Sequence, residues 1–390
     1  MDMAIAHFRQ GRRTRFGFRL AGLSIFGALV AACTPVPPVT AGSQPDPLII
    51  AHRGASAERP EHTLAAYSLA IEQGADYIEP DLVMTRDGVF VARHENEISG
   101  TTDIADHPEF ADRRTTKAID GEEVTGWFTE DFTLAELRTL RARERLPQLR
   151  PGNTEYDGQF PIPTLDEIIA LAQGANRPVG IIPEIKHPSY FRSIGLPMEE
   201  ALVAQLEAAG YDGPDDPVFI QSFEIGPLAR LDILTDIRLV QLIAPSGSPA
   251  DVPDTSYAQM ITPAGLEAVA TYADAIGPEK GLVIPLDDMG ALGDPTMLLS
   301  DAHRAGLLVI PWTFRPENYF LPANLRGQAG EGPRVRRRGD VASEMLVFLQ
   351  AGVDGLFTDA PEEGVYATYL FERPRLMREL EEEARRNGEN

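Results

Sequence analysis

The 390-residue sequence has one cysteine, Cys33, which excludes an internal disulfide framework and any cysteine-rich zinc site. Positive charge is also scarce, since 35 Lys and Arg face 59 acidic residues and the formal net charge is -24. Nucleic acids and anionic surfaces are bound by clustered Lys and Arg, so this balance argues against such partners. If the substrate is an anion, the cations that bind it must be concentrated locally.

A long hydrophobic run is missing as well. The most apolar stretch, LAGLSIFGALVAA, is too short for an ordinary transmembrane helix but suits the core of an export signal. It follows several arginines and ends in VAAC at Cys33, which resembles the bacterial lipobox. We therefore predict a lipoprotein-type signal peptide over residues 1–33, export to the periplasm or cell envelope, and lipid attachment at Cys33. The alternative is an ordinary signal peptide in which Cys33 is incidental. The Pro-rich residues 34–47 predict a semi-rigid tether.

From Leu48 onward, short apolar runs alternate with stretches of helical periodicity. The helical stretches include TLAAYSLAIEQG and TLDEIIALAQG, each closed by a glycine suited to a helix C-cap. This repetition predicts an α/β fold with a parallel sheet, and the number of strands favours a (β/α)8 TIM barrel over an open doubly wound sheet. The predicted strands are 48–51, 76–84, 89–93, 179–185, 218–223, 238–243, 273–278, 307–312 and 355–359.

Three segments break this rhythm. Residues 95–160 follow the second strand region, are rich in charge and contain the helical pattern TLAELRTLRARERL, so they predict a small inserted subdomain. Residues 315–340 form a long polar connection after the seventh barrel strand, and residues 366–390 form a charged C-terminal tail. The barrel domain is therefore predicted over residues 48–365.

Polar side chains follow several of the predicted strands. In (β/α) barrels the active site lies at the carboxyl ends of the strands, so these positions suit catalysis better than packing. His52 and Arg53 come directly after the first strand. Glu79 and Asp81 have the i, i+2 spacing that points two side chains of one strand to the same side. Comparable positions near other strand ends are held by Glu184, Lys186 and His94.

Together these residue types predict a phosphate-cleaving site. Three carboxylates at one barrel mouth repel one another and are costly to desolvate, so we expect a cation among them. Oxygen ligands favour one divalent ion, Ca²⁺ or Mg²⁺, whereas zinc would recruit more His or Cys, although His52 or His94 could supply one nitrogen. Arg53 and Lys186 can bind phosphate, and His52 and His94 can supply the acid and the base for phosphodiester cleavage. Which histidine is the acid does not follow from the sequence.

The run HRGASAERPEHTLAAYSLAIEQGADYIEPDLVMTRDGVFVARHE, followed by IPEIKHP, QSF, PWT and GVDGLFTDAP, closely resembles the glycerophosphodiester phosphodiesterase family, in particular its periplasmic bacterial branch. The resemblance extends from about Leu48 to Val365. It implies a barrel of the phospholipase C-like type with an inserted cap. It also implies metal-dependent hydrolysis of small glycerophosphodiesters, which are deacylated phospholipids, to an alcohol and sn-glycerol 3-phosphate.

The same resemblance implies roles for single residues. Matched by position, they are the catalytic His52 and His94, the metal ligands Glu79, Asp81 and Glu184, and the phosphate- or substrate-binding Arg53, Lys186, Glu61 and Trp312. Glu61 is expected to orient a histidine or an arginine, and Trp312 to pack beside the glycerol. Gln221 and Ser222 are candidate hydrogen-bond partners of the ligand. The family's second histidine is often followed by Asp, whereas Glu95 follows His94 here; it keeps the charge with a different reach, and we expect a small effect.

Alternatives stay open at this point. A related phospholipase C- or D-type barrel enzyme that acts on lysophospholipids could use a similar site, although the few consecutive apolar residues in 95–160 favour a small polar diester. A surface-anchored binding lipoprotein without catalysis would keep the same fold, because fold does not determine function. The intact histidine pair and the three acids argue against it. Cleavage could proceed through a cyclic phosphate formed by the glycerol 2-hydroxyl, or by direct attack of water.

Overall fold

The structure is a computed structural model that describes residues 46–328 and 332–388, with residues 375–388 described by their backbone alone. The predicted signal peptide over 1–33, the predicted lipid attachment at Cys33 and most of the tether over 34–47 lie outside the described residues. In the described ranges, no helix combines the length and the apolar character needed to cross a bilayer.

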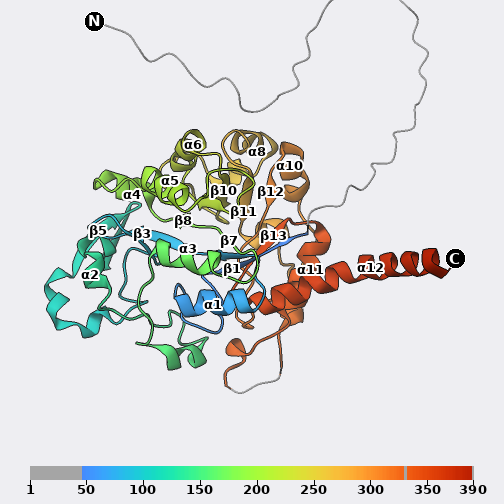
Figure 1. Cartoon of the computed structure of the whole chain (residues 1–390), viewed down its shortest axis with the longest axis horizontal. Coiled ribbons are helices and arrows are strands. Elements are labelled where there is room, and N and C mark those ends of the chain that lie inside the picture. The colour runs from blue at the N-terminus through green and yellow to red at the C-terminus, as the bar shows by residue number, and fades with distance from the viewer. Residues whose placement is uncertain (1–45, 329–331, 389–390) are drawn as a thin grey trace, which may run out of the picture. The chain divides into compact units, whose positions relative to one another are not determined.

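The folded domain is a (β/α)8 barrel, as predicted (Figure 1). The first four strands of the ring are formed by six segments, because two of the strands are interrupted. They are β1 (Leu48–His52), β2 (Tyr77–Glu79) continued by β3 (Asp81–Met84), β7 (Gly180–Ile181) continued by β8 (Glu184–Ile185), and β9 (Phe219–Ser222). The ring goes on through β10 (Arg238–Ile243), β11 (Ala275–Pro278), β12 (Leu308–Val309) and β13 (Gly355–Thr358).

Parallel pairing continues around the ring. One run of paired strands is β13-β1-β2-β7, and the other is β12-β11-β10-β9-β8-β3, with β4 added at its edge. The two runs meet where Pro80 separates β2 from β3 and Pro183 separates β7 from β8, because proline cannot donate a ladder hydrogen bond. The ring closes between β12 and β13, where Asp354 N donates to Val309 O at 2.9 Å and Phe357 N donates to Pro311 O at 3.0 Å.

The strands separate two apolar layers. Because side chains alternate along a strand, Ile50 faces the barrel interior while its neighbour Ile49 packs in the layer under the helices. The interior layer is filled by bulky side chains from around the ring, namely Ile50, Tyr77, Ile182, Phe219, Val240, Leu242, Ala275, Ile310 and Phe357. The barrel is therefore a packed core, and open space is left at its rim.

Helices cover the outside of the ring. They are α1 (Leu64–Glu72), α3 (Leu165–Gln173), α5 (Met198–Ala208), α6 (Ile225–Leu234), α8 (Pro263–Val269), α10 (Leu298–Ala305), α11 (Val341–Ala351) and α12 (Pro361–Gly388), with the shorter α4 (Pro188–Ser193), α7 (Tyr257–Met260) and α9 (Lys280–Val283). α1 and α3 correspond to the two helical patterns found in the sequence. Thr63 caps α1 by accepting from Ala66 N, and Thr164 and Glu167 form a capping box on α3.

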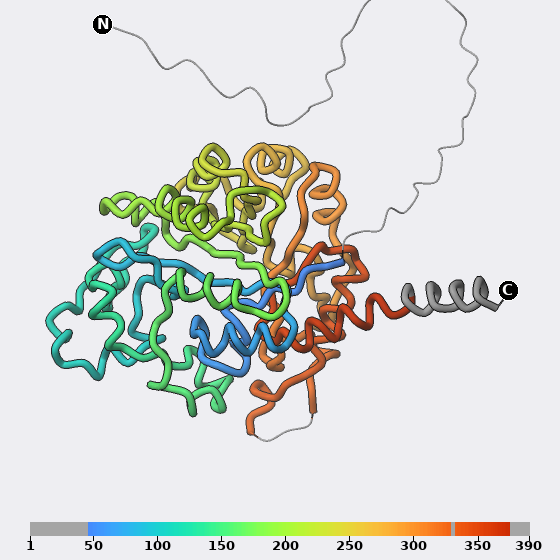
Figure 2. The backbone as a smooth tube through the Cα atoms, in the orientation of Figure 1, coloured from blue at the N-terminus to red at the C-terminus, as the bar shows by residue number. Residues whose placement is uncertain are grey.

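The segment after the second barrel strand leaves the strand-helix rhythm. β4 (Phe90–Ala92) pairs antiparallel with β3, so the predicted strand 89–93 lies outside the parallel ring. The hairpin β5 (Thr115–Ile119) and β6 (Glu122–Gly126) follows, and then α2 (Leu134–Leu137). α2 is shorter than its sequence pattern indicates, since it ends at Leu137 and Ala142 already pairs with Thr102 in a β-bridge. Figure 2 shows this inserted segment, in cyan to green, beside β3 and α4.

Candidate active site

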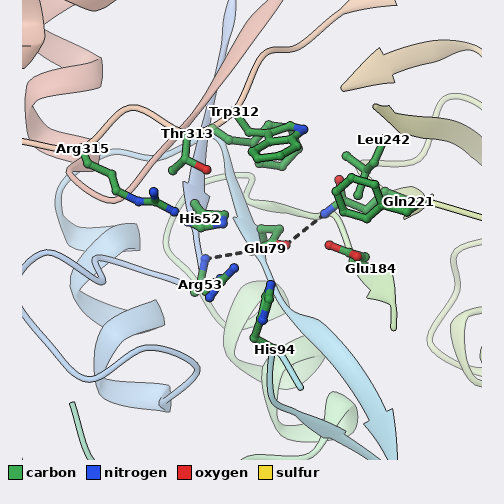
Figure 3. A pocket seen from close by; sticks show the side chains of 12 residues that line it. His52, Arg53, Glu79, His94, Glu184, Gln221, Leu242, Trp312, Thr313 and Arg315 are labelled. Atoms are coloured by element: carbon green, nitrogen blue, oxygen red, sulfur yellow. Dashed lines mark hydrogen bonds between the residues drawn. The ribbon is translucent and has the colours of Figure 1, made fainter. Parts of the chain in front are cut away.

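A cavity of about 110 Å³ opens at the carboxyl ends of the barrel strands (Figure 3). This rim is the place where (β/α) barrels carry their active sites. The polar residues that line the cavity are His52, Arg53, Glu79, His94, Glu184, Gln221, Thr313 and Arg315, and the apolar ones are Phe223, Leu242, Trp312 and Phe357. Six of the nine site residues expected from the sequence therefore line one pocket: His52, Arg53, Glu79, His94, Glu184 and Trp312.

His52 ends β1 and is held by Asp359, the residue that follows β13. The Nδ1 atom of His52 lies 2.6 Å from Asp359 Oδ1, and both side chains are buried. Burial and the charge of Arg53 lower the pKa of His52 to about 4, although Asp359 opposes the shift. The carboxylate can only accept, so Nδ1 carries the proton and the lone pair of Nε2 remains for the pocket.

His94 follows β4 and faces the same pocket, with Arg53 and Glu79 between the two imidazoles in Figure 3. Its Nδ1 atom lies 2.7 Å from Glu95 Oε1. Desolvation in the pocket, together with the charges of Arg53 and Lys186, lowers the pKa of His94 to about 3. Both histidines are thus neutral at physiological pH in the free protein, and each has a carboxylate on Nδ1.

Three buried carboxylates form a cluster at the floor of the rim. Glu79, Asp81 and Glu184 each offer an oxygen atom, and these atoms lie within 4.8 Å of one another. The parallel register that places Asp81 opposite Glu184 brings β3 and β8 together at this point. Burial and the charge of Asp81 raise the pKa of Glu79, and burial raises the pKa of Glu184 to about 8 against the charge of Lys186. Burial and crowding therefore disfavour the charged forms of Glu79 and Glu184, although Arg53 and Lys186 act in the opposite direction.

The donor set fits a divalent cation. Asp81 Oδ2 lies 2.9 Å from His62 Nε2 and 3.2 Å from Arg53 Nε, while Asp81 Oδ1 is buried without a hydrogen-bond partner among the described residues. The carbonyl oxygen of Gln221 is likewise buried and unpaired within that part of the chain, and its amide nitrogen donates to Glu79 Oε1 at 3.0 Å. Buried orphan oxygens next to crowded carboxylates are the ligand type that hard divalent ions take.

Two cations lie next to the cluster in different settings. Arg53 has φ 63°, and its backbone N donates to Glu79 Oε2 at 2.8 Å, so the start of the turn after β1 is tied to the carboxylate cluster. Its Nη1 atom lies 3.2 Å from each oxygen of Glu61. Lys186 Nζ lies 2.9 Å from Glu184 Oε1 and borders a neighbouring cavity of about 280 Å³, which shares Glu184 and Phe223 with the main pocket.

Glu61 and Trp312 support the pocket from two sides. Glu61 does not line the pocket; it lies behind Arg53 and also accepts from Arg145 Nε, at 2.8 Å and 2.9 Å. The two guanidinium groups lower its pKa despite burial. Trp312 donates from Nε1 to Gly277 O at 2.7 Å and meets Phe223 edge-on, with ring centroids 5.8 Å apart. It forms part of the apolar wall of the cavity.

Several residues of the site were missed by sequence reasoning. Asp359 stands at the end of the predicted strand 355–359, so the strand-end rule could have found it. Arg315 donates from Nε to Asp359 Oδ2 at 3.0 Å and lies in the segment interpreted only as a polar connection. Arg150 comes from the inserted segment and donates to the same oxygen, and no local pattern marked it. His62 is fully buried and orients Asp81. Ser222 borders the neighbouring cavity instead.

Two proteins of similar sequence are named glycerophosphodiester phosphodiesterases. A glycerophosphodiester phosphodiesterase of Arabidopsis thaliana is 39% identical over 326 residues, which cover 80% of this chain and 83% of the relative. A glycerophosphodiester phosphodiesterase of Haemophilus influenzae is 30% identical over 354 residues, which cover 82% of this chain and 89% of the relative. The share of each relative that is covered shows that the match extends through nearly whole proteins.

Solved structures show the same fold. A putative glycerophosphoryl diester phosphodiesterase of Silicibacter pomeroyi matches with a TM-score of 0.58 and 22% identity, over 83% of this chain and 93% of that one. A phosphodiesterase of Oleispira antarctica, solved in complex with its product sn-glycerol-3-phosphate, matches with a TM-score of 0.53 and 22% identity, over 82% and 96%. The family model described as "Glycerophosphoryl diester phosphodiesterase family" matches residues 52–363. Because this match takes in nearly all of the barrel and every predicted site residue, the chain belongs to the glycerophosphoryl diester phosphodiesterase family.

Proposed function

We propose that the protein hydrolyses glycerophosphodiesters to an alcohol and sn-glycerol 3-phosphate, with histidine acid-base catalysis and one divalent cation. The observation that carries this proposal is the convergence of His52, His94 and the Glu79, Asp81 and Glu184 cluster on one rim pocket. The names of the sequence relatives support the reaction. The sn-glycerol-3-phosphate held by a structural neighbour supports the product.

His52 is the general base in this proposal. The buried carboxylate of Asp359 fixes the proton on Nδ1 and stabilises the imidazolium that forms when Nε2 accepts a second proton. The nucleophile is the glycerol 2-hydroxyl of the substrate, which is close to phosphorus in the same molecule. Its proton passes to His52 Nε2, its oxygen bonds to phosphorus, and the bond from phosphorus to the alcohol oxygen breaks. The products of this step are a cyclic phosphate and the free alcohol.

His94 is the general acid that protonates the departing alcohol. Glu95 accepts from Nδ1 and favours the protonated imidazole, and the negative charge of the bound phosphodiester raises the pKa of His94 in the same direction. In the second step a water molecule opens the cyclic phosphate, and the two histidines exchange roles. The net reaction consumes one water and leaves both imidazoles as they were.

The divalent cation and Arg53 are proposed to bind the phosphate group. Glu79, Asp81 and Glu184 would hold the divalent ion, which would neutralise the negative charge on the phosphoryl oxygens. Both Ca²⁺ and Mg²⁺ take oxygen ligands. Ca²⁺ is our first candidate and Mg²⁺ our second. Arg53 lines the pocket and offers a planar guanidinium for phosphate oxygens, while Glu61 fixes its orientation. Trp312 gives the glycerol carbons an apolar surface to pack on.

The deciding experiment is a turnover assay of the purified protein. Glycerophosphocholine and lysophosphatidylcholine are offered in parallel, with EDTA and then with Ca²⁺ or Mg²⁺ restored. Glycerol 3-phosphate, choline and phosphocholine are quantified, so that cleavage of either substrate is detected. We expect turnover of glycerophosphocholine that EDTA abolishes and a divalent ion restores. Turnover of lysophosphatidylcholine alone would favour the lysophospholipid alternative, and no turnover of either substrate would favour the binding lipoprotein. A glycerophosphodiester without the 2-hydroxyl should resist cleavage if the cyclic phosphate is formed.

We also propose export and lipid anchoring through Cys33, on the support of the VAAC motif and the preceding apolar run. The cells then carry the enzyme at the envelope, where small diesters from outside can reach it. Replacing Cys33 by Ser should abolish incorporation of labelled palmitate and release the protein from the membrane fraction. Unchanged labelling of the variant would contradict lipid attachment at this residue.

A further inference from the structure

The carboxylate that holds His94 has a second histidine on its other oxygen. Glu95 Oε1 lies 2.7 Å from His94 Nδ1, and Glu95 Oε2 lies 2.9 Å from His187 Nε2. The other ring nitrogen of His187, Nδ1, lies 2.6 Å from Asp120 Oδ2. Four side chains thus form a continuous line of hydrogen bonds that begins in the catalytic pocket and ends at Asp120.

The members of this line come from different parts of the fold. Glu95 follows β4, His187 follows β8 and precedes α4, and Asp120 lies in the turn between β5 and β6 of the inserted segment. His187 has φ 50° and Asp120 has φ 49°, both in the left-handed region. For Asp120 this is the ordinary conformation of the first residue of an Asp-Gly hairpin turn, since Gly121 also has a positive φ of 88°. For His187 it costs about 1 kcal/mol or more, and such conformations cluster at functional sites.

The length of Glu95 is what allows one carboxylate to serve two imidazoles. An Asp at this position would be one methylene shorter and would bring its oxygens closer to its own backbone. Glu95 is half-exposed, so without a second partner its carboxylate would be free to change rotamer. The bond to His187 removes this freedom, because His187 is itself fixed by Asp120.

Charge strengthens the same arrangement. Although burial opposes protonation, the hydrogen bonds to Asp120 and Glu95 raise the pKa of His187 to about 9. The hydrogen bonds from His187 and His94 lower the pKa of Glu95 although burial raises it. At neutral pH an imidazolium therefore holds an ionised carboxylate, and charge-assisted hydrogen bonds of this kind are about twice as strong as neutral ones.

We propose that His187, anchored by Asp120, is a positioning residue that orients Glu95 and thereby sets the tautomer and the direction of His94. The inference rests on the proposed function, in which His94 gives its proton to the leaving alcohol. It assigns a role to the inserted hairpin: through Asp120 the β5-β6 turn becomes part of the support of the acid. Misorientation of His94 would slow the chemical step and leave substrate binding nearly unchanged, since neither His187 nor Asp120 lines the main pocket.

Two substitutions of His187 separate this role from a structural one. The amide nitrogen of Gln stands where Nε2 stands, so His187→Gln keeps a donor for Glu95 and loses the bond to Asp120. The amide of Asn stands near Nδ1, and Asn tolerates the left-handed backbone, so His187→Asn keeps the turn and the side toward Asp120 but loses Glu95. We expect kcat on glycerophosphocholine to fall roughly 10- to 100-fold in His187→Asn and His187→Ala, with KM within about twofold, and to recover largely in His187→Gln.

The melting temperatures of the two variants should rank in the opposite order to their kcat values. His187→Asn should melt at a higher temperature than His187→Gln, because Asn suits the backbone conformation better. If the role of His187 were merely structural, kcat would follow the melting temperature. A His187→Asn variant as active as the wild type, together with a lower kcat in His187→Gln, would therefore overturn the proposal. Glu95→Asp should behave as His187→Asn does. The matched control is His107→Ala, since His107 also lies between two carboxylates of the inserted segment, Asp103 and Glu109, without a link to His94; its kcat should stay at the wild-type value.

A spectroscopic measurement keeps the test independent of turnover. In ¹⁵N NMR spectra of the wild-type protein, His94 should show one fixed tautomer with the proton on Nδ1. His187→Asn and Glu95→Asp should show averaging between tautomers, and His187→Gln should not. Unchanged His94 signals in all three variants would refute the positioning role, whether or not the wild type is active. Absence of glycerophosphodiester cleavage by the wild type would separately refute the proposed function.

Discussion

Asp359 places its carboxylate 2.6 Å from Nδ1 of His52, although 307 positions separate the two residues in the sequence. β1 and β13 pair in parallel with Ala51 opposite Thr358, so the residues that follow them emerge at the same rim. The pairing of the first barrel strand with the last therefore also builds the pair of imidazole and carboxylate on which the proposed base depends. Neither strand contains this pair by itself.

The first prediction concerns this pair. Asp359→Asn keeps the size of the side chain but removes the charge that fixes and stabilises the imidazolium of His52, so kcat should fall by about 100-fold or more with a small change in KM. Steady-state kinetics on glycerophosphocholine measure the effect. The control is Asp354→Asn, because Asp354 forms a similar pair with His303, at 2.9 Å, at the opposite end of β13. That variant should lose stability and keep kcat, and equal kinetic effects in both variants would contradict the assignment.

The second prediction concerns the cation. A ligand that binds only the folded state stabilises it, by about 2.7 kcal/mol at a concentration of 100 times its Kd. Addition of Ca²⁺ or Mg²⁺ to chelator-treated protein should therefore raise the melting temperature of the wild type, and Glu184→Gln should abolish the rise. Glu224→Gln is the matched control, since Glu224 is also a buried acid near the rim but stands outside the cluster. A rise of equal size in Glu184→Gln would remove Glu184 from the ligand set.

The third prediction is a pH dependence of stability. The pKa of His187 is raised in the folded state to about 9 from the ordinary value 6.5, so its stabilising effect is complete below pH 6.5 and is lost as the pH rises through 9. The difference in the free energy of unfolding between the wild type and His187→Asn should shrink over this range by up to about 3 kcal/mol. Urea titrations at several pH values measure it. A difference that stays constant from pH 6 to pH 9.5 would show that His187 carries no raised pKa.

The fourth prediction concerns the apolar wall. Trp312→Ala should raise KM for glycerophosphocholine about 10-fold, equivalent to about 1.4 kcal/mol, because the glycerol loses the ring it packs on. Trp312→Phe keeps an aromatic ring and should recover most of the loss. The second tryptophan, Trp127, donates to Phe110 O in the inserted segment and gives the control. If Trp127→Ala raised KM as much as Trp312→Ala, general destabilisation would explain both.

The strands and the main site residues could be predicted because their signals are local. Polar residues directly after apolar runs located His52 and Arg53, and the two-residue spacing placed Glu79 and Asp81 on one side. Strand 89–93 had the same apolar signal as the barrel strands, yet β4 turns back antiparallel on β3, and the sequence pattern does not distinguish these directions. The inserted segment could be predicted to exist, while its hairpin β5-β6 and the shortness of α2 depend on pairings with distant residues.

What the sequence determined by itself is the alternation that makes the barrel and the family motifs that it carries, since periodicity and strand-end chemistry act over a few neighbouring residues. What the tertiary structure decided is which charges meet. Asp359 reaches His52 across the pairing of β1 with β13, Arg150 comes from the insertion to the same carboxylate, and Glu95 bridges to His187. The physical reason is that a hydrogen bond between side chains needs atoms within about 3 Å, and only the closed ring with its docked insertion fixes such separations between residues far apart in the chain.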